Sequence, residues 1–221
     1  MTIKAIWCEP GESIPKDIFS KLKKCPRDTD NAKYLKDLCS VFGVDPTTLP
    51  RLDRDLKLVL GGFIGGEGSF NISAKKSPTG KFGILITPEF SLTQHVNGIG
   101  YLLGALELFK VGSFSHKSGS NATLMYKIGG APTLREVVLP FWKEYISPTQ
   151  PPLLRQEREK FIKVLDLLLL NKEEAGLDRF LYEILPLWDS LRKQKGQSNE
   201  SFPNLSSAQD FAREFVKKKK K

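Results

Sequence analysis

The stretch LGGFIGGEGSF, residues 60–70, marks a helix that passes directly into a strand. The apolar spacing of LKLVLGGFIGG predicts a helix over residues 56–66, with Asp53 or Asp55 as the N-cap. From Ser69 onward the apolar period changes to two, which predicts a strand. The fold therefore depends on a junction that holds five glycines and a single carboxylate.

Four of these glycines fall inside the predicted helix, although each costs about 1 kcal/mol relative to alanine. Gly61 and Gly65 lie four residues apart, as do Gly62 and Gly66, so the glycines are expected to line one side of the helix. A side without side chains lets another backbone come very close. That backbone belongs either to the same helix of a second copy, across a twofold axis, or to another segment of the same core.

Glu67 ends the predicted helix, where the helix dipole makes a carboxylate unfavourable. Two such helices side by side would bring two carboxylates together, an arrangement that requires a cation between them. Oxygen ligands on a crowded anionic site suit Mg²⁺, or Mn²⁺ in its place, with phosphate oxygens as further ligands. Glu67 therefore favours the interpretation of the four glycines as a dimer interface.

Beyond this junction the sequence predicts an α+β fold, in the order helix, two strands, helix, two strands and then helices. Pro88 indicates a bulge or an edge in the second strand, Pro140 a break in a later helix and Pro186 a disturbance in another. No second copy of the glycine-rich helix follows, so the chain is not an internal duplication. We therefore divide the chain into a helical N-terminal extension (1–55), a core (56–145) and a helical C-terminal extension with a lysine tail (146–221).

Charge is distributed unevenly along the 221 residues. The net charge is +9, and five of the positive charges are the tail lysines Lys217–Lys221. Residues 69–128, which hold the predicted strands, contain six lysines and two acids and so account for the rest of the excess. Positive charge confined to one predicted sheet is typical of a polyanion-binding surface.

Other features of the composition exclude several classes of protein. Three cysteines without close spacing predict no disulfide framework and a reducing compartment, and two histidines with no cysteine nearby exclude a zinc finger. No apolar run approaches the roughly 20 residues of a membrane span. The N-terminal MTIKAIWCEPGESIPKD lacks the features of a signal or transit peptide. We expect neither a membrane nor a small-molecule substrate as partner.

The segment LGGFIGGEG, residues 60–68, resembles the LAGLIDADG motif of homing endonucleases, and the αββαββα order that follows resembles the core of that family. Three further stretches are similar to the algal chloroplast large-subunit rRNA intron endonucleases that act as homodimers: TPEFSLTQHVNG (87–98), SHKSGSNAT (115–123) and RKQKGQSNESFPN (192–204). The resemblance covers most of the chain. It implies a four-stranded antiparallel saddle sheet in each monomer. It also implies a homodimer that cuts double-stranded DNA at a long pseudo-palindromic site, expected in an rRNA gene, and leaves 3′ overhangs.

The resemblance further implies roles for individual residues. Glu67 matches the acid that binds the catalytic metal, with Gly66 beside it, and Gln94 matches a glutamine that orders active-site water. Lys143 follows the Pro-Phe pair of the family at a shorter spacing, and is the candidate for stabilising charge at the scissile phosphate. Gly98 departs from the basic residue that some relatives carry there. The implied compartment is an organelle, a chloroplast before a mitochondrion, with the protein made inside it.

DNA would lie on the polar faces of the predicted strands, whose side chains could read base edges in the major groove. The first pair of strands supplies Ser69, Asn71, Ser73, Lys75, Thr87, Glu89, Ser91 and Thr93. The second pair supplies Ser113, Ser115, Lys117, Thr123, Met125 and Lys127. Phosphate contacts are expected from Lys76, Lys81, His116 and the tail lysines.

Two other functions stay open at this point. A non-catalytic member of the family, acting as an RNA maturase or a DNA-binding regulator, could keep the glycine helix. The presence of Glu67 and Gln94 opposes that alternative, whereas the unmatched basic positions leave room for it. A plain structural dimer is the third candidate. The sequence does not decide whether the terminal extensions brace the dimer or extend the DNA contact.

Overall fold

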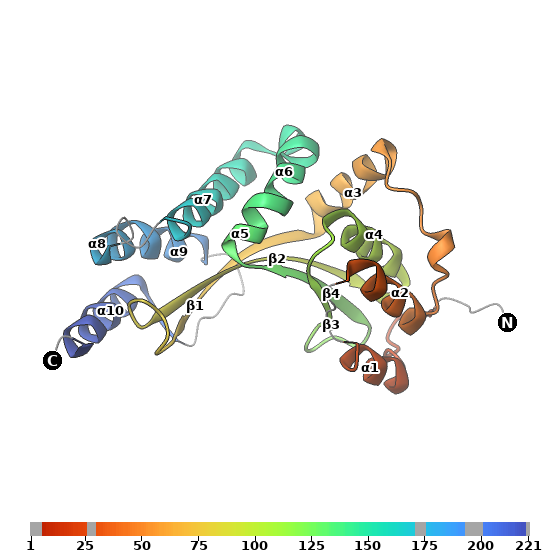
Figure 1. Ribbon diagram of the computed structural model, residues 1–221, viewed down its shortest axis with the longest axis horizontal. Helices are drawn as coiled ribbons and strands as arrows, with labels where there is room; N and C mark the ends of the chain where they lie inside the picture. Colours follow the sequence, from red (N-terminus) through yellow and green to blue (C-terminus); the bar gives the residue numbers. More distant parts are fainter. Residues whose placement is uncertain (1–5, 26–29, 171–175, 193–200, 220–221) are drawn as a thin grey trace. The chain divides into compact units, whose positions relative to one another are not determined.

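The computed structural model describes residues 6–25, 30–170, 176–192 and 201–219. The chain forms two compact units (Figure 1). The first comprises Met1–Ser69, Phe90–Ile128 and Val137–Thr149, and the second comprises Phe70–Glu89, Gly129–Glu136 and Gln150–Lys221. These units cut across the three segments expected from the sequence, because individual strands continue from one unit into the other.

The four expected strands are present and form one sheet in the order β1-β2-β4-β3. The strands are β1 (Gly68–Lys76), β2 (Ile84–His95), β3 (Ser113–His116) and β4 (Thr123–Gly129). β3 and β4 form an antiparallel hairpin in which Ser113 pairs with Lys127 and His116 with Leu124. Buried residues alternate with half-buried ones along β4, which confirms the predicted period of two.

Pro88 lies in β2, which is an inner strand in the sheet order. Its neighbour β4 ends at Gly129, and the next residue, Gly130, donates its N–H to the Pro88 carbonyl at 3.2 Å. Pro88 therefore sits beside the point where a neighbouring strand stops. There the missing N–H of a proline costs least, so the predicted edge exists locally.

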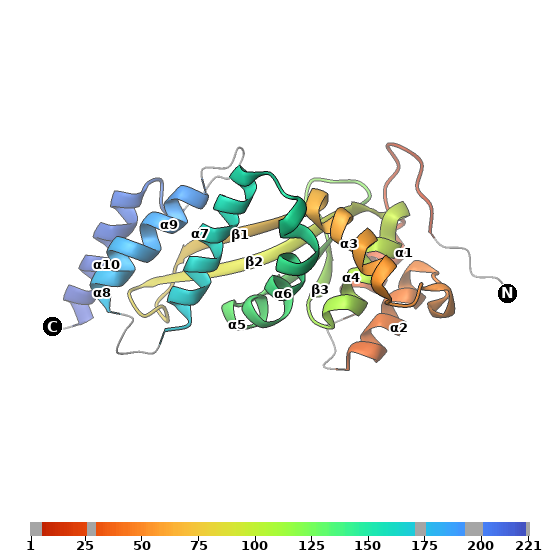
Figure 2. The same ribbon diagram turned by 90° about the horizontal axis from the view of Figure 1, so that it is seen from above.

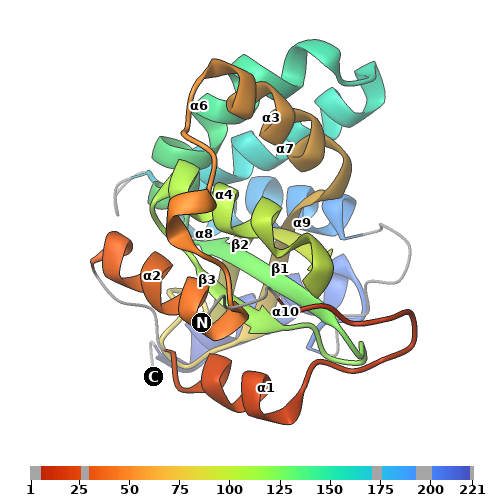
Figure 3. The ribbon, with the colours of Figure 1, turned by 90° about the vertical axis from the view of Figure 1, so that its right-hand side faces the viewer.

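In the first unit, Figure 3 shows α3 and α4 on one side of the strands and α1 on the other. Asp53 caps α3 by accepting a hydrogen bond from the Leu56 N–H at 2.9 Å, which decides between the two predicted caps. The helices of this unit are α1 (Lys16–Lys23), α2 (Asn31–Phe42), α3 (Arg54–Glu67), α4 (Ile99–Phe109) and α6 (Leu139–Phe141).

In the second unit, α7 crosses over the β1–β2 hairpin (Figure 2). Asn204 caps the C-terminal helix α10, because its Oδ1 accepts from the Ser207 N–H at 2.8 Å. The helices of this unit are α5 (Ala131–Thr133), α7 (Pro152–Leu168), α8 (Leu177–Arg179), α9 (Leu185–Leu191) and α10 (Leu205–Lys219).

Pro140 and Pro186 do not break their helices, which corrects the expectation from the sequence. Pro140 lies in α6 between two π-helical turns, Leu134–Val138 and Trp142–Ile146. Pro186 lies in α9 directly after a third, Phe180–Ile184. A proline lacks the N–H for the carbonyl four residues earlier, and its ring crowds that carbonyl. The wider π turn accommodates the ring, so the helix continues.

Side-chain amides fasten the N-terminal extension to the first unit. Asn97 donates from Nδ2 to the Cys8 carbonyl at 2.8 Å and accepts from the Cys8 N–H at 2.9 Å. Asn121 donates from Nδ2 to the Gly11 carbonyl at 3.3 Å, and the backbone carbonyl of Asn121 accepts from the Ile14 N–H at 3.1 Å. The extension therefore bridges the turn after β2 and the turn between β3 and β4.

The three cysteines are free thiols, as predicted. Burial raises the pKa of Cys39 to about 11, with a smaller contribution from Asp45, so this thiol stays protonated at neutral pH. Within the described part of the chain, no helix combines the length and the apolar character that crossing a bilayer requires.

Candidate active site and DNA interface

The C-terminal end of α3 carries the expected catalytic carboxylate. Glu67 is the last residue of the helix, and it is exposed. Gly68 follows it at a position that has no room for a side chain, since a Cβ there would lie 2.3 Å from the Ile64 carbonyl oxygen and 3.2 Å from the Phe90 ring. This tight exit takes the chain from α3 into β1 and places the start of β1 beside the second half of β2.

One edge of α3 packs within its own chain. A Cβ on Gly61 would lie 3.2 Å from the Cβ of Tyr145, and a Cβ on Gly65 would lie 3.4 Å from Cγ2 of Ile146. Both contacts are with the π-helical turn Trp142–Ile146. Gly61 and Gly65 therefore make room for this turn, which supports the alternative of packing within one core for these two positions, and their contact with a second copy stays a prediction.

Gly62 and Gly66 lie on the other edge of α3, which is exposed. A Cβ on either would meet no described atom within 4 Å. Val59, one turn before Gly62, is 55% exposed, and its neighbour Leu58 is 51% exposed. This open edge is apolar and has no side chains along its second half, so the contact with a second copy stays a prediction for Gly62 and Gly66.

Gln94 lies half-buried at the end of β2. Its Oε1 accepts a hydrogen bond from the His95 N–H at 2.8 Å. A Cβ on Gly98 would lie only 2.7 Å from Cγ and 2.8 Å from Cδ of Gln94. Gly98 thus leaves the space that the Gln94 side chain occupies, which gives a physical reason for the missing basic residue at this position.

Lys143 is exposed on the turn Trp142–Ile146, the same turn that packs against Gly61 and Gly65. Its helical turn is therefore held directly against α3. The three predicted catalytic side chains, those of Glu67, Gln94 and Lys143, thus belong to the same compact unit.

A single chain does not complete a metal site in the residues that the structure describes, where no group of three or more His, Cys, Asp or Glu side chains could hold an ion. The predicted site offers the carboxylate of Glu67 and the backbone carbonyl of Gly66. In the predicted site, further ligands would be waters or would come from a second copy or from DNA.

On β1 and β2, seven of the eight side chains predicted to read DNA are half-buried or exposed: Ser69, Asn71, Ser73, Lys75, Thr87, Glu89 and Thr93. Ser91 differs, because it is only 7% exposed and its neighbours Phe90 and Leu92 are fully buried. β2 is covered on both faces at that point, so a direct DNA contact by Ser91 is not supported. Leu85, on the same face as Thr87, is 49% exposed.

On the β3–β4 hairpin all six side chains predicted to read DNA are accessible: Ser113, Ser115, Lys117, Thr123, Met125 and Lys127. His116 behaves differently. Its ring packs edge-on to Phe19 of α1, with the ring centroids 5.0 Å apart, and its Nε2 lies 3.4 Å from the Asn121 carbonyl oxygen. His116 is therefore a packing residue between β3 and α1, and the expected phosphate contact is not supported.

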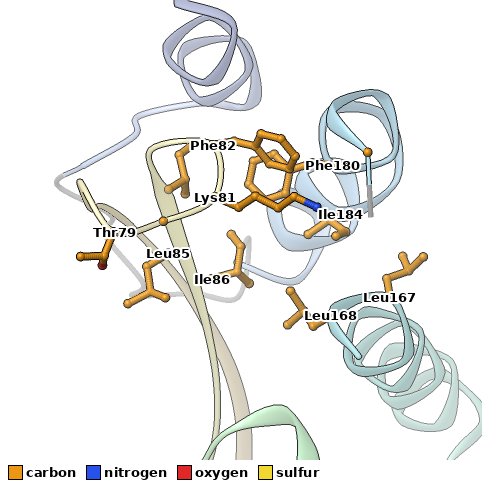
Figure 4. A pocket seen from close by; sticks show the side chains of 12 residues that line it. Thr79, Lys81, Phe82, Leu85, Ile86, Leu167, Leu168, Phe180 and Ile184 are labelled. Atoms are coloured by element: carbon orange, nitrogen blue, oxygen red, sulfur yellow. The ribbon is translucent and has the colours of Figure 1, made fainter. Parts of the chain in front are cut away.

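The lysines beside the β1–β2 turn make contacts within the second unit. Nζ of Lys76 lies 5.3 Å from the ring centre of Phe211 and 5.7 Å from that of Phe202, a cation–π arrangement that ties β1 to α10. Lys81 points into an apolar cavity of about 270 Å³, toward Ile184 (Figure 4). These contacts account for both lysines without DNA, and their phosphate contacts stay predictions.

The tail lysines are carried by α10, whose last turn exposes Lys217–Lys219. Lys220 and Lys221 lie outside the described residues. Gly83 has a positive φ of 75°, and a Cβ there would lie 2.6 Å from the Phe215 ring. The absence of a side chain at Gly83 therefore lets α10 pack against the turn of the hairpin that is predicted to read DNA.

The sequence model of the LAGLIDADG endonuclease family matches residues 60–151. The DNA endonuclease I-CeuI of Chlamydomonas moewusii is 46% identical over 213 residues, which are 95% of this chain and 96% of that protein. This chain belongs to the LAGLIDADG endonuclease family.

Solved structures of LAGLIDADG endonucleases share the fold. The structure of the group I intron-encoded homing endonuclease I-CeuI complexed with DNA has a TM-score of 0.85 at 44% identity and covers 94% of this chain and 100% of that chain. The LAGLIDADG homing endonuclease I-SmaMI, bound to cleaved DNA, has a TM-score of 0.55 at 30% identity and covers 72% of this chain but 48% of that chain. The archaeal I-Vdi141I, with a TM-score of 0.63 at 21% identity, shares the fold alone.

These matches confirm the predicted family, the α+β fold and the homing endonuclease function. They do not support the alternative of a non-catalytic maturase or regulator. The roles of Glu67, Gln94, Lys143 and the DNA-reading side chains stay predictions within this LAGLIDADG endonuclease.

Sequence reasoning missed three features of this endonuclease. Exposed Leu58 and Val59 extend the open edge of α3. They lie four and three residues before Gly62, so helical spacing could have predicted that they share this edge. The two hydrogen bonds between the Asn97 side chain and the Cys8 backbone have no signal in the sequence, because the two residues lie 89 positions apart. The lysines of α1 do not show in the net charge of residues 1–55, because acids elsewhere in this segment nearly cancel its positive charges.

Proposed function

We propose that this chain is one half of a homodimeric LAGLIDADG endonuclease that cuts both strands of DNA at a long, specific site. The observation that carries the proposal is the open edge of α3, along which exposed Gly62 and Gly66 lead to exposed Glu67. One chain supplies a single carboxylate there, on an edge shaped for a second helix. Family membership supports DNA cleavage as the reaction.

Two observations support a second copy as the partner of α3. Leu58 and Val59 continue the glycine edge with exposed apolar side chains, which a contact across a twofold axis would cover. In addition, the match with I-SmaMI covers 72% of this chain but only 48% of that chain. This chain therefore corresponds to about half of a longer endonuclease, and a second copy would supply the other half.

A divalent cation fits the donor set that two chains would provide. Mg²⁺ binds through one or two carboxylates together with waters and phosphate oxygens. The Glu67 carboxylates of two chains and the scissile phosphates make up such a set, with the Gly66 carbonyl as a further oxygen. Mg²⁺ or Mn²⁺ held there would activate water and offset the charge of the leaving 3′-oxygen.

The side chains of each protomer would have separate tasks around the scissile phosphate. Glu67 would hold the cation. Gln94 is fixed at Oε1 by the His95 N–H, so its Nε2 amide is oriented to donate to a water and to position it for attack. Lys143 would place positive charge near the phosphate as negative charge develops in the transition state.

The accessible face of the sheet would enter the major groove. Its serine, threonine and asparagine side chains can donate to or accept from base edges, and two sheets would cover a pseudo-palindromic site of two helical turns or more. Lys217–Lys219 at the end of α10 would contact phosphates, which contributes affinity without sequence information.

The target that we propose is an rRNA gene without its intron, in a chloroplast or another organelle, cut with 3′ overhangs. I-CeuI, which is 46% identical, is described as encoded by a group I intron. An enzyme encoded in an intron benefits from a target at the site where that intron inserts.

The test is cleavage of a plasmid that carries an intronless large-subunit rRNA gene. With Mg²⁺ the wild-type protein is expected to linearise the plasmid at one position, and sequencing of the ends should show 3′ overhangs. Glu67→Gln should lower the cleavage rate by about 10³-fold or more while sequence-specific binding persists. Asp55→Asn, which changes an exposed acid in the first turn of the same helix, is the matched control and should keep full activity.

Three results would overturn this proposal. Specific binding without cutting, or equal cleavage by Glu67→Gln and wild type, contradicts the catalytic role of Glu67. A monomeric mass in solution and on DNA contradicts the assignment of Gly62 and Gly66 to a dimer.

A further inference from the structure

Helix α1 carries a concentration of positive charge that the function proposed above does not use. Its eight residues and the following Lys24 hold four lysines, all exposed, and one aspartate. Ile18 and Leu22 form the buried side that packs on the first unit. The rest of α1 is therefore a basic surface attached to the core by one narrow apolar stripe.

α1 lies beside the edge strand β3, on the side of the strands away from α3 and α4 (Figures 1 and 3). The docking contact is Phe19 against His116, with the ring centroids 5.0 Å apart. α1 therefore continues the protein surface beyond the last strand of the sheet, next to Ser113 and Ser115, which are predicted to read DNA.

A cavity of about 500 Å³ opens between α1 and β3. Ser113 and Ser115 of β3 and Lys23 of α1 are among the residues that line it. Nζ of Lys23 rests 4.3 Å from the ring centre of Phe19, which keeps the ammonium at the cavity. Lysine ammonium groups and serine hydroxyls are donors that proteins commonly use for DNA phosphates.

Helical geometry divides the lysines of α1 between two flanks. Lys16 and Lys23 are seven residues apart and share the flank of Phe19, toward β3. Lys21 lies on the opposite flank, where its Nζ forms an exposed ion pair with Asp17 at 3.1 Å. The flank toward β3 therefore carries positive charge without a facing acid of the same helix.

We propose that α1 contacts the DNA backbone and extends the interface past β3, with Lys16 and Lys23 at phosphates of the outer part of the target. This inference rests on the proposed DNA endonuclease function. It assigns the N-terminal extension to DNA binding as well as to the fold. Because these contacts are with phosphates, they add affinity and salt dependence and leave base preference unchanged.

The experiment measures binding of the full-length protein to a duplex centred on the cleavage site mapped in the rRNA gene plasmid, as a function of salt. Lys16→Gln/Lys23→Gln should bind about tenfold or more weakly at 0.1 M salt. The slope of log K against log salt should fall by about 1 for each phosphate that the variant no longer neutralises. Hydroxyl-radical protection should disappear at the outer ends of the site and persist at its centre.

Two matched variants serve as controls. Lys33→Gln/Lys36→Gln removes two exposed lysines from α2. Lys21→Gln/Lys24→Gln removes the remaining lysine of α1 and the lysine that directly follows the helix. Neither variant should change the salt slope as much. A slope for Lys16→Gln/Lys23→Gln equal to that of wild type, or an equal loss of affinity in the α2 control, overturns the inference. Absence of specific binding by the wild-type protein overturns instead the function on which it rests.

Discussion

The side chain of Gln94 and the glycine at position 98 depend on each other. Position 98 is where some relatives carry a basic residue. Gly98 has no side chain, and Gln94 fills the space that a side chain would need. The amide of Gln94 is then held from one end by the His95 N–H. The absence of a side chain at position 98 is thus coupled to the conformation of Gln94.

Gly98→Ala tests this coupling. The new methyl would lie 2.7 Å from Cγ of Gln94 and must displace that side chain, so we expect cleavage to slow by about tenfold to a hundredfold with DNA affinity unchanged. Single-turnover cleavage and gel-shift titration separate the two effects. Gly100→Ala, at an exposed glycine of the neighbouring α4 with no described atom within 4 Å, should leave both values unchanged. Equal rates for Gly98→Ala and wild type would show that the position of Gln94 does not matter.

The sequence permits the identification of Glu67 and Gln94 because each stands at a fixed offset in a recognisable motif. It cannot show the reason for Gly98, since that reason is the rotamer of a side chain four residues earlier. The burial of Ser91, which gives no support to its predicted DNA contact, escapes the sequence for a similar reason. Strand alternation assigns it to the polar face, but coverage of β2 on both faces depends on segments distant in sequence.

Among the helices, α3 shows how one glycine pattern can serve two contacts. The spacing of four predicts one glycine face, but two adjacent positions on a helix differ by 100°, enough to place them on different edges. Gly61 and Gly65 receive the turn Trp142–Ile146, and Gly62 and Gly66 stay open. The packing within one chain therefore belongs to the first pair, and the predicted contact with a second copy is left to the second pair.

Gly62→Leu and Gly61→Ala should separate the two contacts. Leucine at position 62 meets no described atom of its own chain, so the folded protomer should keep its helix content while the dimer dissociates and cleavage is lost. Alanine at position 61 crowds Tyr145 at 3.2 Å, which should offset the roughly 1 kcal/mol that alanine gains over glycine in a helix, so the free energy of unfolding should change by less than about 1 kcal/mol and the mass in solution should stay the same. Sedimentation and thermal unfolding at several concentrations measure both quantities.

Ser40→Leu, at an exposed position of α2, controls for the added leucine in this comparison. It should leave the mass and cleavage unchanged. A Gly62→Leu variant that remains dimeric would show that the open edge of α3 is not the interface.

Other elements show where sequence reasoning fails at intermediate range. The strands are predicted well because one face of the sheet is buried and alternation records that directly. Pro140 and Pro186 predict interruptions that do not occur, since the option of a π turn depends on packing of the helix rather than on local residues. The basic character of α1 disappears when charge is averaged over residues 1–55, in which nine acids nearly cancel ten lysines and arginines.

In the proposed dimer, the molecule that acts on DNA is larger than one chain. Within the described residues one protomer offers no metal site of three or more ligands, and it matches about half of I-SmaMI. In a symmetric homodimer, a second copy of the same chain would supply the other half of the site. Activity would then depend on protein concentration.

A tandem fusion of two copies, joined by a long flexible Gly/Ser linker, should therefore act as a single-chain endonuclease. Intramolecular pairing replaces a bimolecular step with an effective concentration of up to about the millimolar range. We expect the fusion to cut the same site at dilutions where the unlinked protein loses activity, with a rate proportional to protein concentration rather than to its square. Cleavage assays over a dilution series measure this.

Val59→Ala, made in both the unlinked protein and the fusion, tests whether this side chain acts on assembly. Removing part of an exposed apolar side chain beside Gly62 should weaken the unlinked dimer without touching Glu67 or Gln94. The same substitution placed in both halves of the fusion should regain most of the lost activity, because the linker compensates for the weaker contact. Failure of the fusion to rescue Val59→Ala would mean that this side chain acts on catalysis or DNA rather than on assembly, and the open edge of α3 would need another partner.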